Sequence, residues 1–239
     1  MKAAFSPEGD SAVRISLGEE IDEEVNRQVH ALAGMIEAFR PAGVLELVPS
    51  YRSLLVVYDP LVVGYDRLRR QLAGLAGKVA VNVQSTTRVL QVPCCYDGPD
   101  LADVAQLAGI SVNEVIRIHS QPVYRIYMLG FLPGFVYLGG LDRRIHAPRL
   151  QSPRKAIPAG SVGIGGSQTG IYPLASPGGW RLIGRTPLVM YDPLREPSIP
   201  VKAGDGIRFL PVEVREFEAL QAEYASGKRW PVFEEVQLG

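Results

Sequence analysis

The chain has 239 residues, of which 46% are hydrophobic and 21% charged, a composition typical of a globular protein with one large domain or two small ones. Its 25 basic and 25 acidic side chains cancel, which argues against a nucleic acid or a membrane surface as partner, because both require a positive field. No apolar run approaches the roughly 20 residues that span a bilayer, and Met1 to Pro7 is not expected to be a secretory signal, because it has one Lys and no apolar core.

Residues 1–86 are predicted to form a small α/β domain. Alternating apolar residues indicate half-buried strands, and apolar residues three or four apart indicate amphipathic helices. In chain order the predicted elements are a strand over 13–17, a helix over 21–39, strands over 44–48 and 54–58, a helix over 65–75 and a strand over 79–83. The order β-α-β-β-α-β is that of a ferredoxin-like domain.

Residues 87–239 are predicted to form a second domain, because the composition changes after a polar stretch at 84–87. Residues 130–200 contain 12 of the 25 glycines and 10 of the 19 prolines, and residues 156–180 contain no charged side chain. Such a pattern is typical of a small closed or partly closed β-barrel. The predicted pieces are strands over 124–129, 161–164, 182–183 and 188–191 and a short helix around Phe217, Leu220 and Tyr224.

Residues 100–119 resemble a bacterial helix-turn-helix, with two short helices around a glycine turn. Ser111 and Glu114 form a capping box that defines the start of the second helix. That helix carries one basic residue, Arg117, whereas phosphate contacts require several. A plain helical hairpin is therefore the preferred interpretation over DNA binding.

Motifs of the common catalytic classes are missing. The sequence contains no GxxxxGK[ST] phosphate loop, no HExxH and no GxSxG, and no metal-ligand spacing. The adjacent Cys94 and Cys95 are expected to be reduced thiols with a structural role in a cytoplasmic protein.

Two segments nonetheless have an unusual backbone. Residues 130–141 alternate Gly and Pro with aromatic residues, which fits either a packed Ω-loop or a ligand-binding loop. Residues 158–173 combine many glycines with neutral polar side chains. They fit either an anion-binding nest of backbone amides or tight barrel turns that require Gly.

These two segments, with residues 176–188 and 202–205, resemble the signature of the family known as KipI, allophanate hydrolase subunit 1 or the B subunit of 5-oxoprolinase. The similarity covers nearly the whole chain and is densest from residue 119 to residue 188. The resemblance implies an α+β protein in which a small N-terminal α/β domain precedes a cyclophilin-like β-barrel.

The resemblance also implies a function. Most bacterial members resemble a B subunit that works with a homologous C subunit and an A subunit to open 5-oxo-L-proline to L-glutamate, driven by ATP. ATP with Mg²⁺ is expected to be bound by the assembled complex, and little activity is expected of the chain alone. The alternatives are a KipI-type inhibitor of a sensor histidine kinase and a component of an allophanate- or urea-amide-processing enzyme.

The expected site lies on the barrel domain, between loop 131–135 and turn 168–172, and is closed by residues 177–180. The residues expected to contact substrate are Phe131, Pro133, Gly134, Phe135, Gln168, Thr169, Tyr172, Gly178, Gly179 and Trp180. The same face, rich in aromatic residues and Arg, is alternatively a docking surface for the C subunit.

Charged and titratable residues near these segments complete the expectation. Arg154 and Ser161 are candidates for nucleotide or phosphate binding, and His119 and Arg185 for catalysis. His119 follows a predicted helix, whose C-terminal dipole favours a protonated imidazole. A helix cap and plain surface charges are the alternatives for these residues.

Overall fold

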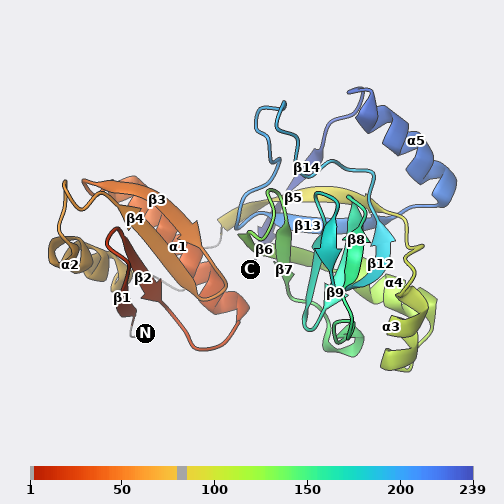
Figure 1. Cartoon of the computed structure of the whole chain (residues 1–239), viewed down its shortest axis with the longest axis horizontal. Helices are drawn as coiled ribbons and strands as arrows, with labels where there is room; N and C mark the ends of the chain where they lie inside the picture. The colour runs from red at the N-terminus through yellow and green to blue at the C-terminus, as the bar shows by residue number, and fades with distance from the viewer. Residues whose placement is uncertain (1–2, 80–84, 239) are drawn as a thin grey trace. The chain divides into compact units, whose positions relative to one another are not determined.

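The structure is a computed structural model that describes residues 3–79 and 85–238. The chain divides into two compact units, residues 1–84 and residues 85–239 (Figure 1). Within the described ranges, no helix is both long enough and apolar enough to cross a membrane.

The N-terminal unit is a four-stranded antiparallel sheet with two helices. Its elements are β1 (Ala4–Glu8), β2 (Ala12–Ser16), α1 (Glu23–Phe39), β3 (Val44–Pro49), β4 (Ser53–Tyr58) and α2 (Tyr65–Ala76), with the strand order β1-β2-β4-β3. Helix α1 is capped at its N-terminus by Asp22, whose carboxylate accepts hydrogen bonds from the backbone N–H groups of Glu24 and Val25. Its apolar face packs with the inward residues of β2, β4 and α2 in one core.

The predicted ferredoxin-like arrangement of this unit is not confirmed by its described residues. The predicted helices and the first three predicted strands are confirmed, but β1 was missed because Ser6 and Pro7 lower its strand propensity. Pro is tolerated there because β1 is an edge strand. Strand β1 occupies the place beside β2 that the fourth strand of a ferredoxin-like sheet would take. Of the predicted strand over 79–83, Val79 lies outside any element and the rest lies outside the described residues.

The C-terminal unit is built on an eight-stranded sheet that curls into a partly closed barrel (Figure 1). The sheet order is β12-β9-β10-β7-β6-β13-β5-β14, and β13 pairs with β5 in parallel. Its strands are β5 (Ser85–Cys94), β6 (Val123–Leu129), β7 (Val136–Gly139), β9 (Ser161–Gly165), β10 (Gln168–Ile171), β12 (Arg181–Arg185), β13 (Gly206–Pro211) and β14 (Val232–Leu238). A separate pair is formed by β8 (Arg154–Ile157) and β11 (Ser176–Gly178).

The C-terminal unit also contains helices. They are α3 (Leu101–Ala108), α4 (Val112–Ser120), the 3₁₀ turn η1 (Arg143–Ile145) and α5 (Val214–Ala225). The predicted hairpin at 100–119 is confirmed as α3 and α4, and the Ser111 hydroxyl accepts from the Glu114 N–H. Val104, Val115 and Ile118 of this hairpin are buried in the barrel core. The hairpin therefore packs on the sheet.

One predicted strand in this unit is wrong. Residues 188–191 belong to no strand, although Leu188 and Met190 are buried. The alternation of apolar residues reflects one-sided packing of a loop. Pro187, which has no backbone N–H, precedes it, and the Leu188 N–H donates to the Thr186 hydroxyl in a turn. The other predicted strands lie within β6, β9 and β12, and the C-terminal helix is α5.

Candidate functional site

An aromatic pocket of about 300 Å³ opens on the C-terminal unit. Its lining comes from three of the segments singled out in the sequence and from the loop that precedes β8. The lining residues are Phe131, Phe135, Tyr137, Arg149, Pro153, Tyr172, Pro177, Gly178, Gly179 and Trp180. The structure thus brings together Phe131, Phe135, Tyr172 and the 178–180 segment, as the sequence predicted.

Phe135 is the centre of the pocket wall. Its ring lies 4.7 Å from that of Tyr137, 5.1 Å from that of Tyr172 and 5.6 Å from that of Trp180, measured between centroids. The contacts with Tyr172 and Trp180 are edge-to-face, with interplanar angles of 88° and 83°, an arrangement that aromatic pairs favour. Ile157 and Leu182 complete this small core. The wall is therefore a rigid set of interlocked rings.

The glycine-rich segment 158–173 provides room for this wall. A Cβ at Gly165 would lie 2.4 Å from the indole nitrogen of Trp180, so only Gly allows the indole to pack against β9. This close approach explains Gly165 by packing against an aromatic ring, which neither the anion nest nor the tight-turn interpretation anticipated.

Phe131 stands at the rim of the pocket in a strained backbone conformation. Its φ is 69°, in the left-handed region that non-Gly residues rarely adopt, and its side chain is exposed. The turn behind it is closed by hydrogen bonds from the Phe135 N–H to Leu132 O and from the Gly130 N–H to Phe135 O. A strained backbone of this kind persists only where surrounding contacts hold it, and such residues are found more often at ligand sites than elsewhere.

Arg149 is the cation of the aromatic pocket. Its guanidinium carbon lies 5.9 Å from the centroid of the Trp180 ring. Among the described residues, no carboxylate forms an ion pair with it, and no acidic side chain lines the pocket. Sequence reasoning missed Arg149 because it lies in a loop outside the glycine-rich segments.

Arg154 and Ser161, predicted to bind phosphate, are committed to other partners. Arg154 pairs with the buried Asp100 at 2.6 Å, and the second oxygen of Asp100 accepts from the Leu182 N–H. The Ser161 hydroxyl donates to Pro158 O at 2.8 Å. Neither side chain lines the pocket, since each is held in the internal structure of the barrel.

Other predicted site residues also lie outside the pocket lining. Arg185 forms a 2.8 Å ion pair with Asp97 and stacks over Phe217, 4.2 Å from its centroid. The predicted substrate-contacting residues outside the lining are Pro133, Gly134, Gln168 and Thr169. Thr169 is fully buried, so its hydroxyl does not reach the pocket.

His119 lies in a buried polar chain. Its Nδ1 is 2.7 Å from the Tyr96 hydroxyl and its Nε2 is 2.8 Å from the Thr169 hydroxyl, which donates to Gly163 O. Because the Thr169 proton goes to Gly163, Thr169 accepts from Nε2–H, and Nδ1 accepts from Tyr96. The chain thus fixes one neutral tautomer of His119.

The expectation of a protonated His119 is wrong. Burial lowers the pKa of His119 to about 3, because the charged imidazolium would lose its hydration. The residue does lie near the C-terminus of α4, but the dipole there is outweighed by complete burial. Burial likewise raises the pKa of the free thiols of Cys94 and Cys95.

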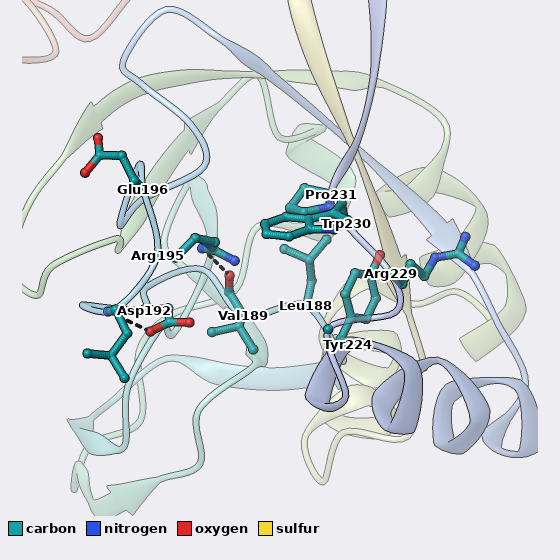
Figure 2. Close-up of a pocket in the computed structure, with 11 residues that line it drawn as sticks. Leu188, Val189, Asp192, Arg195, Glu196, Tyr224, Arg229, Trp230 and Pro231 are labelled. Carbon is teal, nitrogen blue, oxygen red and sulfur yellow. Dashed lines mark hydrogen bonds between the residues drawn. The ribbon is translucent and has the colours of Figure 1, made fainter.

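A second hollow of about 330 Å³ lies between loop 188–196 and the turn that joins α5 to β14 (Figure 2). We refer to it as the Trp230 hollow. It is lined by Leu188, Val189, Asp192, Leu194, Arg195, Glu196, Tyr224, Gly227, Arg229, Trp230 and Pro231. Arg195 donates to Val189 O at 3.0 Å, and Arg229 pairs with Glu223 at 3.3 Å.

Comparison with known proteins identifies relatives over most of the chain. The family described as carboxyltransferase domain, subdomain C and D, matches residues 3–201. The 5-oxoprolinase B subunit of Bacillus subtilis (strain 168) is 42% identical over 228 residues, which cover 90% of this chain and 95% of the relative. A more distant relative is urea amidolyase of Saccharomyces cerevisiae, 24% identical over 95% of this chain and 14% of that protein.

Solved structures are also similar to this chain over most of its length. The protein PH0987 from Pyrococcus horikoshii is 49% identical, with a TM-score of 0.54 over 90% of this chain and 100% of that chain. TTHA0988 is 40% identical, with a TM-score of 0.76 over 84% of this chain. The match spans 40% of TTHA0988, so that protein is considerably longer than the shared part.

Proposed function

This chain belongs to the family of 5-oxoprolinase B subunits, and we propose that it is the B subunit of an ATP-dependent 5-oxoprolinase. In this proposal it opens 5-oxo-L-proline to L-glutamate together with an A subunit and a homologous C subunit, in the cytoplasm. The aromatic pocket is its share of the substrate site.

The observation that carries the proposal is the convergence of three separate segments on one pocket that has aromatic walls and, among the described residues, Arg149 as its cation. The substrate is a small five-membered lactam with one carboxylate. Aromatic rings offer a flat apolar surface to the lactam ring, and a guanidinium suits a carboxylate. A cavity of about 300 Å³ has room for a ligand of this size.

The pocket's own chemistry is binding and orientation. Phe135, Tyr172 and Trp180 are buried and interlocked, so they hold a ring in one place and keep water from one of its faces. Burial raises the pKa of the Tyr137 and Tyr172 phenols, which therefore remain neutral hydroxyls at pH 7.

The described residues do not fit a Mg²⁺-ATP site in this chain. Arg154 and Ser161 are held by Asp100 and Pro158, and no group of three acidic, His or Cys side chains among the described residues is arranged to hold a metal ion. A lactam is a resonance-stabilised amide, so its opening requires activation that the pocket itself does not offer. We assign ATP with Mg²⁺ to the partner subunits, which makes the working site composite.

Reconstitution tests this function. The chain is co-purified with its A and C subunits and assayed for ATP-dependent glutamate formation from 5-oxo-L-proline. Urea and allophanate are tested separately as alternative substrates. We expect activity on 5-oxo-L-proline by the complex and little by the chain alone. Full activity of the chain alone would refute the composite site. Activity on urea or allophanate only would favour the urea amidolyase relatives, and inhibition of a histidine kinase without any lactam activity would favour the KipI-type role.

A further inference from the structure

We propose that Arg149 binds the substrate carboxylate and makes the aromatic pocket select lactam acids over neutral lactams. This inference rests on the proposed function and assigns a specificity-determining role to a residue that the sequence did not single out. It follows from the position of Arg149, its lack of an acidic partner among the described residues and the charge of the pocket.

The backbone around Arg149 is held in place from both sides. The guanidinium of Arg181 donates from Nε to Pro148 O at 3.1 Å, and the Leu150 N–H donates to Gly179 O at 2.7 Å. Arg181 is itself paired with Asp103 at 3.1 Å. Arg149 therefore projects from an anchored loop that is tied directly to the pocket residue Gly179.

Neighbouring arginines of this unit are already engaged. Arg144 pairs with Asp142 at 2.7 Å, Arg154 with Asp100 at 2.6 Å and Arg181 with Asp103 at 3.1 Å. Arg149 is exposed, and the described residues offer it the Trp180 ring but no carboxylate. Its guanidinium is thus available to an anionic ligand.

The pocket as a whole, as far as the described residues line it, has one positive charge and no negative one. Arg149 is its charged lining residue, and the other lining residues are aromatic, Pro or Gly. Burial raises the pKa of Tyr137 and Tyr172, whereas the positive charge of Arg149 lowers it. The field of Arg149 therefore reaches both phenols of the pocket. An anionic group is therefore favoured beside the rings, and a guanidinium binds a carboxylate with two parallel hydrogen bonds.

The test uses the assembled complex and three variants of this chain. Arg149→Gln removes the charge, Arg149→Lys keeps the charge but loses the two-pronged geometry, and Arg143→Gln is the matched control. Arg143 is an exposed arginine in η1 of the same unit that does not line the pocket. The measured quantities are KM and kcat for 5-oxo-L-proline and the inhibition constant of 2-pyrrolidinone, the same lactam without a carboxylate.

We expect Arg149→Gln to raise KM for 5-oxo-L-proline about tenfold, because a hydrogen-bonded charge pair is lost, and to change kcat much less. The KM of Arg149→Lys should lie between those of the wild type and Arg149→Gln. The KM of Arg143→Gln should equal that of the wild type. The inhibition constant of 2-pyrrolidinone should be the same in all four proteins.

Two outcomes would overturn the inference while the proposed function stands. One is a wild-type KM in the Arg149→Gln complex. The other is an equal loss of 2-pyrrolidinone binding, which would mean that the substitution damages the pocket itself. A wild-type complex that forms no glutamate from 5-oxo-L-proline would instead refute the proposed function, and with it this inference.

Discussion

The aromatic pocket and the Trp230 hollow have similar volumes, and both contain a tryptophan and an arginine, yet their charges are arranged differently. In the aromatic pocket Arg149 has no acidic partner among the described residues and no acid lines the wall. In the Trp230 hollow, Arg195 donates to the backbone carbonyl of Val189 (Figure 2). Arg229 pairs with Glu223. The difference shows why we propose the aromatic pocket, and not the Trp230 hollow, as the ligand site: its guanidinium is available to an anion.

The two tryptophans differ in the same way. Trp180 is 5% exposed and interlocked with Phe135 and Tyr172, whereas Trp230 is 65% exposed. A buried ring that still lines a cavity is a fixed wall, since its neighbours leave it one orientation. An exposed ring at a rim is held by few contacts.

The largest effect is expected when Trp180 and Trp230 are each replaced by Ala. Trp180→Ala should lower the free energy of unfolding by about 3 kcal/mol, because a buried aromatic side chain is removed, and should abolish activity of the complex on 5-oxo-L-proline. Trp230→Ala should change stability by no more than about 0.5 kcal/mol. Urea denaturation followed by circular dichroism measures both. Equal losses in the two variants would contradict the distinction between wall and rim.

The next effect concerns the polar chain behind the aromatic pocket. On β10, Thr169 bonds His119, and the next residue, Gly170, approaches the Trp180 ring. Burial lowers the pKa of His119 to about 3, below the ordinary value near 6.5. The unfolded chain therefore binds more protons between pH 6.5 and pH 3, so the stability from neutral His119 is complete above pH 6.5 and is lost as the pH falls towards 3.

This dependence is measurable against a variant that does not titrate. Between pH 7 and pH 5 the wild type should lose about 2 kcal/mol more than His119→Gln, by the linkage relation. Urea midpoints of both proteins at the two pH values give the difference, because the two proteins differ only at residue 119. Parallel losses in the two proteins would show that His119 is not held neutral.

The sequence predicted the regular elements better than their arrangement. Helix α1 was legible from apolar spacing and the acidic first turn, and the α3–α4 hairpin from the Ser111 cap, because these are local signals. Strand β1 and the loop at 188–191 were misjudged, since pairing partners and one-sided packing are set by distant residues. The extra antiparallel strand beside β2 is likewise a tertiary choice.

In the candidate site, the aromatic residues were predictable from the sequence and the charged residues were not. Phe135, Tyr172 and Trp180 were predicted because Gly, Pro and aromatic residues mark their segments, and the structure places them on one wall. The charged candidates were not separable, because the sequence does not reveal that Asp100 and Asp97 lie beside Arg154 and Arg185. Arg149 was missed because it lies outside the glycine-rich segments, and the sequence does not reveal that it lacks an ion pair with any described carboxylate.

The smallest expected effect compares Gly165, which packs against the pocket residue Trp180, with Gly227, which lines the Trp230 hollow. In Gly165→Ala the new methyl group would lie 2.4 Å from the indole nitrogen of the buried Trp180, so the ring must move, at a cost of about 2 kcal/mol. In Gly227→Ala nothing lies within 4 Å of the new group, and only the left-handed backbone, with φ at 69°, costs about 1 kcal/mol. The stability difference between the variants is modest, but their effects on ligand binding should separate clearly. Gly165→Ala should raise KM for 5-oxo-L-proline in the complex by displacing the wall, whereas Gly227→Ala should leave KM unchanged, as steady-state assays at matched folded fractions can show. A raised KM in Gly227→Ala would place the Trp230 hollow in the substrate site and remove the contrast between the two.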